Sequence, residues 1–309
     1  MDTDKSYINA DPDATHPVQG NVQPDATHPL QGSVQPDATH PVQGSVQPEG
    51  ERAVRDGILP EATGHEIRIL HLYHDLMNLY GAWGNTAILM RAIEAHGHTA
   101  VIDRKSVGDD VDFSLYSFIH IGCGTERSLR ACMRDITRHR DAFVARIEAG
   151  ALVLATGNSH ELFGCAVTDP GGSRYKTIGL LGFETFQKNS RVTGDCICSV
   201  SFLDGELIGF INRAGHGQEG EIDRPFTMTM GPGANDVSHT EGIRYKNLLG
   251  TYMTGPILIR NPHLLEYYVS LICPGNCARD GDDLLFSAQE RAYRLALREL
   301  SARLPARTT

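Results

Sequence analysis

Short apolar runs alternate with helix-like patterns from about residue 64 onward, and few folds accommodate such an alternation. The strand-like runs are Ile67 to Tyr73, Thr99 to Asp103, Leu115 to Gly122 and Ala151 to Ala155. Helical spacing of apolar side chains covers residues 84–96, 126–150, 262–272 and 283–303. The run at 151–155 is wholly apolar, which is typical of a strand in the middle of a parallel sheet. The order therefore predicts an α/β three-layer domain with a mostly parallel central sheet.

Two short segments follow predicted strands and mark the candidate site. Gly122-Cys123-Gly124 comes directly after one strand, and Thr156 to Ser159 comes directly after another. Function in open α/β sheets sits at the carboxyl ends of the strands, so we expect both segments to border one pocket. Residues 177–260 are richer in strand patterns, with candidates near 196–203, 206–211 and 226–230.

The first 60 residues differ in composition and form a predicted tail. Residues 12–47 hold three copies of a 12-residue repeat, PDATHPVQGNVQ, PDATHPLQGSVQ and PDATHPVQGSVQ. Such proline-rich copies cannot bury enough apolar surface to offset their chain entropy. We therefore expect disorder in residues 1–60 and a folded domain over residues 64–305. A tether for a partner or a metal, built on His16, His28 and His40, is the alternative interpretation.

Composition excludes several classes of protein. The net charge of -10 argues against nucleic acid or an anionic membrane as a partner, because both need a basic face. There is no apolar run of about 18 residues and no secretory signal pattern after Met1. The seven cysteines are an odd number, which favours reduced thiols and a cytoplasmic location. Their spacing is no zinc signature, and we expect neither a metal nor another cofactor.

Four stretches resemble the GatD-like glutaminase subunit of lipid II isoglutaminyl synthase, in the CobB/CobQ branch of class I glutamine amidotransferases. They are residues 73–85 (YHDLMNLYGAWGN), 121–127 (IGCGTER), 154–164 (LATGNSHELFG) and 241–258 (EGIRYKNLLGTYMTGPIL). The family's counterparts read roughly DxMNLYxxxGN, a triple-glycine loop followed by arginine, LxxCGGYQxLG and EGxxYKNLLGTYxHGPxL. The resemblance runs from about residue 66 to 275, and its first and last motifs are long and specific.

This resemblance implies a three-layer, flavodoxin-like amidotransferase fold and a definite chemistry. In the family a cysteine at a sharp strand-to-helix elbow attacks the carboxamide of glutamine, and a histidine activates the thiol. Backbone N–H groups of the elbow and of the glycine loop stabilise the oxyanion. The released ammonia passes to a Mur-ligase-like (MurT-like) partner in a heterodimer, which amidates a peptidoglycan precursor.

Both members of the family's catalytic dyad are replaced in this chain. Aligned residue by residue, the nucleophile falls on Gly157 and the histidine on Thr254. A further family histidine falls on Arg213, and the middle glycine of the oxyanion loop falls on Cys123. Glycine keeps the positive φ of an elbow without steric cost but supplies no sulfur. Threonine does not titrate near neutral pH. We therefore expect the glutaminase reaction to be lost.

Three residues, Cys123, Cys165 and Ser159, are alternative candidates for the nucleophile. Cys123 can serve as a relocated nucleophile if His160 or His216 supplies the base, although a small buried thiol is the simpler interpretation. Cys165 is expected to pack in the core. Ser159 is expected to cap the helical segment that follows, because exposed N–H groups there need an acceptor.

Other residues are candidates for binding rather than chemistry. The predicted substrate site comprises Gly122, Cys123, Gly124, Arg127 and Asn158. The resemblance places Arg127 where the family has an arginine, which can hold a carboxylate through a bidentate contact, and a solvated charge at a helix start is the alternative. Asn78 and Asn85 are expected to fix their loop by side-chain hydrogen bonds.

The sequence supports three functional hypotheses. The first is a degenerate amidotransferase subunit that acts as a scaffold, regulator or ammonia conduit for its ligase partner. The second is an active enzyme that uses Cys123. The third is a small-molecule binding protein that reuses the old pocket for glutamine or a related ligand.

Overall fold

The computed structural model describes residues 66–217, 222–274 and 284–304. The three repeats, and the disorder predicted for residues 1–60, lie outside the described residues. Within the described part of the chain, no helix is both long and apolar enough to cross a membrane.

A six-stranded sheet forms the centre of the domain, and the predicted α/β architecture is confirmed. Its order is β11-β12-β4-β3-β1-β2. The strands are β1 (Ile67–Leu72), β2 (Ala100–Lys105), β3 (Phe118–Ile121), β4 (Leu152–Thr156), β11 (Ile243–Tyr245) and β12 (Leu248–Thr251). All neighbours pair in parallel except β11, which is antiparallel to β12. Every residue of β3, β4 and β12 is buried, as expected for strands covered on both faces.

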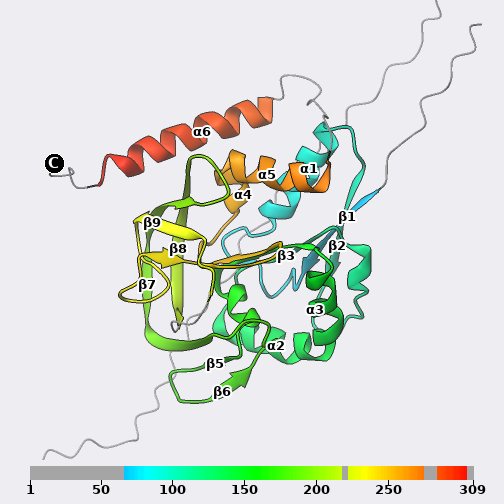
Figure 1. Cartoon of the computed structure of the whole chain (residues 1–309), viewed down its shortest axis with the longest axis vertical. Helices are drawn as coiled ribbons and strands as arrows, with labels where there is room; N and C mark the ends of the chain where they lie inside the picture. The colour runs from blue at the N-terminus through cyan, green and yellow to red at the C-terminus, as the bar shows by residue number, and fades with distance from the viewer. Residues whose placement is uncertain (1–65, 218–221, 275–283, 305–309) are drawn as a thin grey trace, which may run out of the picture. The chain divides into compact units, whose positions relative to one another are not determined.

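Helices cover both faces of this sheet (Figure 1). One face carries α1 (Gly84–Ala95), α4 (Ile257–Arg260) and α5 (Pro262–Ile272), and the other carries α2 (Glu126–Ile136) and α3 (Arg140–Glu148). Alternate side chains of β4 enter different cores, with Leu154 in one and Val153 in the other. Because successive side chains of a strand point to opposite faces, β4 joins the two cores into one three-layer domain.

A second, mostly antiparallel sheet stands beside the carboxyl ends of the central strands. It comprises β5 (Ala166–Thr168), β6 (Arg174–Lys176), β7 (Glu184–Val200), β8 (Glu206–Gly217), β9 (Phe226–Met230) and β10 (Thr240–Glu241). Helix α6 (Leu284–Ser301) packs against it, where Leu300 meets Ile197 and Ile208. This sheet supplies the residues that close over the candidate site.

Two predicted elements differ from the structure. The single helix expected over residues 126–150 is broken by a 3-10 turn at Thr137–His139, where the Thr137 hydroxyl donates to the Arg134 carbonyl at 2.9 Å. The strand expected at 206–211 is part of the longer β8, and the one expected at 196–203 overlaps the end of β7, which stops at Val200 before a turn. The apolar pattern does not reveal the extra length of β7, because residues 188–191 are exposed. Pairing with β8 on either side of these residues holds them in the strand.

Candidate functional site

The predicted elbow lies where β4 ends. Gly157 has a φ of +66° and begins the 3-10 segment Gly157–Phe163, all of which is buried. Its N–H donates to the carbonyl of Met253 at 3.0 Å, from the segment that follows β12. Glycine takes this left-handed conformation at no steric cost. The sharp bend expected of a nucleophile elbow is therefore present, with no side chain at its apex.

The side chain of Cys123 fills the space above that apex. A Cβ built on Gly157 would lie 2.5 Å from both the Cβ and the Sγ of Cys123. The two segments chosen from the sequence thus meet in direct contact. The sulfur next to the elbow apex therefore belongs to the loop residue Cys123 and not to the elbow residue itself.

The environment of the Cys123 thiol disfavours its reactive form. The residue is 2% exposed, and burial raises the pKa of the thiol to about 11. The thiol donates to the Gly124 carbonyl at 3.8 Å. Since the thiolate is the nucleophile, Cys123 is almost wholly protonated at neutral pH.

Neither histidine considered as a base is placed to activate this thiol. The Nδ1 of His160 lies 2.9 Å from the Gly157 carbonyl, and its ring packs edge-on against Tyr252 with 3.9 Å between centroids. Burial lowers the pKa of His160 to about 3. His216 on β8 has its Nδ1 3.2 Å from Asp236, an ion-pair distance without hydrogen-bond geometry. Burial lowers the pKa of His216 as well.

Thr254, which the resemblance predicts to stand in the place of the family's histidine, is hydrogen-bonded to the second sheet. Its N–H and its hydroxyl both donate to the Phe210 carbonyl, at 2.8 and 3.0 Å. The residue is 2% exposed. The hydroxyl is thus committed to the backbone of β8 and holds the chain after β12 against that strand.

Asn158 closes the other side of the site. Its Nδ2 donates to the Gly124 carbonyl at 2.9 Å, and its Oδ1 accepts from the Gly124 N–H at 3.0 Å. The resemblance assigned that N–H to an oxyanion hole, and here it already has a partner. Ser159 is not the expected cap, because its hydroxyl donates to the carbonyls of Ile121 and Thr156. The carbonyls of Gly124, Ile121 and Thr156 thereby accept hydrogen bonds from side chains of the elbow segment itself.

The loop glycines are required by close packing. A Cβ on Gly122 would lie 2.2 Å from the Met77 carbonyl, and one on Gly124 would lie 2.4 Å from the Met77 sulfur. The segment containing Met77 is held as expected, since Asn78 accepts from the Trp83 N–H at 2.8 Å. Asn85 likewise accepts from the Leu258 N–H at 3.0 Å.

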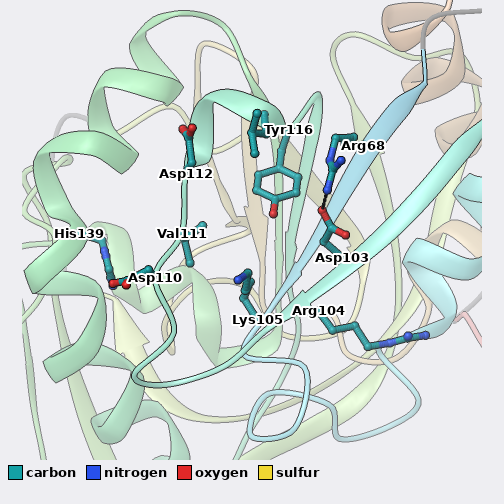
Figure 2. A pocket seen from close by; sticks show the side chains of 10 residues that line it. Arg68, Asp103, Arg104, Lys105, Asp110, Val111, Asp112, Tyr116 and His139 are labelled. Carbon is teal, nitrogen blue, oxygen red and sulfur yellow. Dashed lines mark hydrogen bonds and ion pairs between the residues drawn. The ribbon is translucent and has the colours of Figure 1, made fainter.

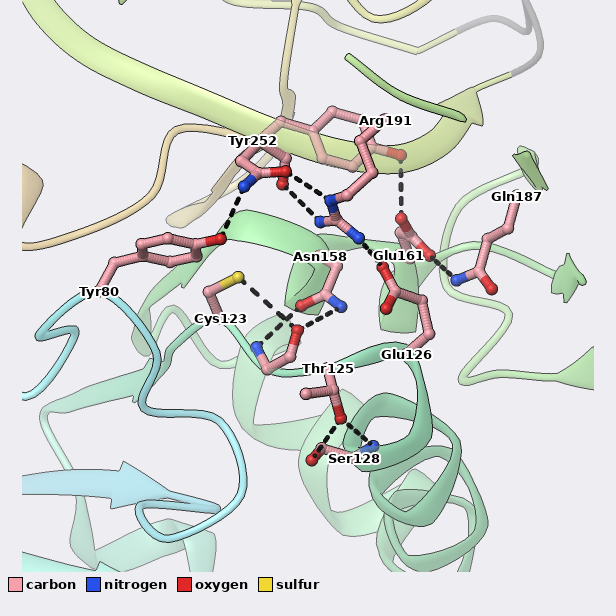
Figure 3. Close-up of polar contacts among 12 residues, drawn as sticks. Tyr80, Cys123, Thr125, Glu126, Ser128, Asn158, Glu161, Gln187, Arg191 and Tyr252 are labelled. Atoms are coloured by element: carbon pink, nitrogen blue, oxygen red, sulfur yellow. Dashed lines mark hydrogen bonds and ion pairs between the residues drawn. The ribbon is translucent and has the colours of Figure 1, made fainter. Parts of the chain in front are cut away.

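A guanidinium reaches the site from an unexpected strand. Arg127 is exposed on α2, and its assignment to the substrate remains a prediction. Arg191 of β7 instead donates to the Glu126 carboxylate at 2.5 Å, as Figure 3 shows. It also donates to Asn212 of β8. Asn212 in turn donates to the Tyr80 hydroxyl at 2.7 Å. No sequence pattern marks Arg191, which is brought to α2 by the pairing of β7 with β8.

A buried polar cluster, also missed by the sequence analysis, lies behind the elbow. The Glu161 carboxylate accepts from Tyr252 at 3.1 Å and from Gln187 at 3.2 Å, and burial raises its pKa to about 7. Arg213, 1% exposed, donates to two backbone carbonyls and stacks on the Tyr252 ring at 5.3 Å. The sequence offered one sign of this cluster, the acidic residue Glu161 four positions after Gly157 and next to the apolar Leu162.

One other prediction is settled by the structure, and one pocket lies apart from the site. Cys165 is exposed, which corrects the expectation that it packs in the core, because it lies just past the buried segment that ends at Phe163. A pocket of about 900 Å³ lies along the edge strand β2, and Figure 2 shows its mixed charges, including the Arg68–Asp103 ion pair. No elbow residue lines that pocket, so it is separate from the candidate site.

Comparison with known proteins identifies the family of the domain. The model of the CobB/CobQ-like glutamine amidotransferase domain matches residues 68–262. The GatD subunit of lipid II isoglutaminyl synthase from Staphylococcus aureus is 29% identical over 68% of this chain and 85% of its own length. The corresponding GatD subunit from Streptococcus pneumoniae is 31% identical over 65% of this chain and 78% of its own length.

Among solved structures, PurLQS from Thermotoga maritima matches with a TM-score of 0.45 and 12% identity, over 75% of this chain and 99% of the matched chain. The family model spans the central sheet from β1 to β12 together with the elbow. With that match and the 31% identity to a GatD subunit, the chain belongs to the CobB/CobQ-like glutamine amidotransferase family.

Proposed function

We propose that this protein is a GatD-like subunit that has lost glutaminase chemistry and acts with a Mur-ligase-like partner in amidation of a peptidoglycan precursor. Its two relatives are named as subunits of lipid II isoglutaminyl synthase, and a subunit implies a partner. Residues 64–305 form the amidotransferase-like domain of this proposal, and residues 1–60 form its tail.

The contact between Gly157 and Cys123 carries the proposal. Covalent attack on a carboxamide needs a nucleophile at the apex and a base within hydrogen-bond reach. Here the apex has no side chain, the neighbouring thiol is buried with a raised pKa, and Thr254 stands in the histidine position. Loss of the nucleophile or base costs related enzymes several orders of magnitude.

Oxyanion stabilisation is compromised as well. The N–H of Gly124, in the glycine loop that supplies an oxyanion donor in the family, already donates to Asn158. Removal of one oxyanion donor typically costs about 100-fold to 1,000-fold in rate. With the nucleophile, the base and one oxyanion donor altered, the role that remains is binding to the partner.

The first experiment measures ammonia release from glutamine by the purified chain, alone and with a Mur-ligase-like subunit. We expect no release above background for the native sequence. We then restore the family pattern in the triple variant Cys123→Gly, Gly157→Cys, Thr254→His, which should regain glutaminase activity by several orders of magnitude over the native chain.

The single variant Gly157→Cys is the matched control. Its Cβ would lie 2.5 Å from Cys123, so it should destabilise the elbow and remain inactive. Glutamine hydrolysis by the native chain at rates typical of an amidotransferase would refute the loss of chemistry. Failure to bind a Mur-ligase-like subunit in size-exclusion chromatography would refute the partner.

One observation favours a second function, an active enzyme that uses Cys123. The sulfur lies at the elbow apex, 2.5 Å from the position of a Cβ at residue 157. A glutamine-like diazo-ketone would then label Cys123, and Cys123→Ala would abolish labelling. Unlabelled native protein excludes this function.

A further inference from the structure

Four polar side chains from four separate segments are joined in a row beside the elbow. The Tyr80 hydroxyl accepts a hydrogen bond from the Asn212 side chain at 2.7 Å. The Asn212 side chain accepts one from the Nε of Arg191 at 2.5 Å, and Arg191 donates to the Glu126 carboxylate at 2.5 Å. The contacts therefore run without a break from the loop before α1, through β8 and β7, to the first residue of α2.

Both ends of this row are attached to the loop that carries Cys123. The N–H of Leu79, next to Tyr80, donates to the Cys123 carbonyl at 2.8 Å, and Glu126 follows Cys123 by three residues. Figure 3 shows Tyr80 on one side of Cys123 and Glu126 on the other, with Arg191 between them. The row and the loop therefore form a closed ring of contacts around the buried thiol.

The weakest link of the ring is the ion pair between Arg191 and Glu126. Their side chains are 38% and 30% exposed. Exposed ion pairs contribute little net free energy, and salt screens them. Arg191 also comes from the part of β7 where the ladder with β8 is interrupted, between Gln187 and Val192. The pair can therefore break while the two strands stay paired on either side of it.

We propose that the Arg191–Glu126 pair is a gate over Cys123, closed in this structure, which opens when a competing anion or raised ionic strength breaks the pair. An open gate admits small solutes to the elbow, and a closed gate excludes them. This inference goes beyond the proposed function and does not depend on it, because access to a thiol is measured without glutamine or a partner subunit. Loss of the gate would leave the loss of glutaminase chemistry untouched, and glutaminase activity would leave the access measurement intact.

The rate at which methyl methanethiosulfonate modifies Cys123 in the full chain tests the proposal. The thiolate attacks the reagent's sulfur, a disulfide forms and methanesulfinate leaves, and peptide mass spectrometry follows each cysteine separately. We expect Cys123 to react much more slowly than the exposed Cys165. Glu126→Gln should accelerate modification of Cys123 about fivefold. Arg191→Ala should accelerate it at least about tenfold, because it also removes the hydrogen bonds to Asn212.

The direction of the Arg191→Ala effect distinguishes a gate from a purely electrostatic role. Burial raises the pKa of the Cys123 thiol to about 11, and the positive charge of Arg191 opposes this rise. Removal of the charge alone would leave less thiolate, the reactive form, and would slow the reaction. Acceleration therefore reports access to the thiol and not its ionisation. A rate at Cys123 that is unchanged or lower in Arg191→Ala would overturn the proposal.

Ionic strength provides a second measurement on the native chain. Raising the salt concentration from about 0.1 M to about 1 M shortens the screening length from about 10 Å to about 3 Å. Modification of Cys123 should accelerate several-fold over this range, whereas Glu126→Gln, which has no ion pair to break, should not respond. A native rate at Cys123 that is independent of salt would show that the ion pair does not control access.

Two controls separate the gate from loss of the fold. Cys132, buried on α2, should stay unmodified in every variant, and equal rates at Cys132 and Cys123 would overturn the proposal by showing that the whole domain opens. Arg303→Gln is the matched control. Arg303 pairs with Asp195, also on β7, at 2.8 Å, and its substitution should leave the rate at Cys123 unchanged.

Discussion

The two ends of β12 relate differently to the family pattern that the sequence resembles. Before the strand, Tyr245-Lys246-Asn247 matches that pattern. After the strand, Thr254 stands where the resemblance predicts a histidine. The first end is anchored to the end of α3, where Tyr245 donates to Glu148 at 2.7 Å and Asn247 donates to the Gly150 carbonyl at 2.8 Å. The second end borders the elbow.

The difference separates residues that hold the fold from residues that perform chemistry. Lys246 adopts a φ of +52° and also contacts Glu148, so the retained motif forms a turn fastened to a neighbouring helix. That turn lies at the amino end of β12, away from the carboxyl ends where catalysis takes place in this fold. The similarity of this segment to the family pattern is therefore explained by its structural role, and it is compatible with loss of the reaction.

The largest expected effect comes from adding a side chain at the elbow. Gly157→Ala should lower the free energy of unfolding by about 3 kcal/mol, because it combines a positive φ with overlap against Cys123. In a Cys123→Gly background the same substitution should cost only about 1.5 kcal/mol, since the strained φ alone remains. Urea denaturation of the four proteins in this cycle measures the coupling. Equal costs in both backgrounds would show that the two positions are not in contact.

A smaller effect concerns how the free energy of unfolding depends on pH. This dependence should come more from Glu161, beside the elbow, than from the turn before β12. The pKa of Glu161 is raised in the folded state to about 7, above its ordinary value of 4.5. As pH rises from 4.5 to 7 the unfolded chain ionises first, so the free energy of unfolding contributed by this group falls. The slope is at most about 1.4 kcal/mol per pH unit.

Glu161→Gln removes this dependence. Relative to the native chain, the variant should gain stability as pH rises through that window. Denaturation at pH 5, 6 and 7 gives the difference, in which the opposite contribution of His160 cancels. Parallel curves for the two proteins would contradict the raised pKa of Glu161.

The smallest predicted effect lies at the retained turn. Asn247→Ala removes the hydrogen bond to the Gly150 carbonyl and should lower the free energy of unfolding by about 1 kcal/mol. The loss should be the same in native and triple-variant backgrounds, because distant sites are additive. Thermal denaturation checks the cost. A change in the restored glutaminase rate would show that the turn reaches the chemistry after all.

Much of the fold could be predicted because its signals are local. The apolar run that forms β4 and the proline that starts α5 are visible as patterns of a few residues. The break at Thr137–His139 and the full length of β7 were missed. The first depends on a single hydroxyl contact, and the second on cross-strand pairing that an exposed polar segment does not reveal.

The sequence by itself determined the α/β order and the glycine at the end of β4 that forms the elbow. Only the tertiary structure decided that Cys123 packs against Gly157, and that Arg191 rather than Arg127 pairs with a carboxylate beside the site. The reason is physical. Periodicity records which face of an element is buried, whereas contacts between residues 34 or 65 positions apart depend on how strands align and pack.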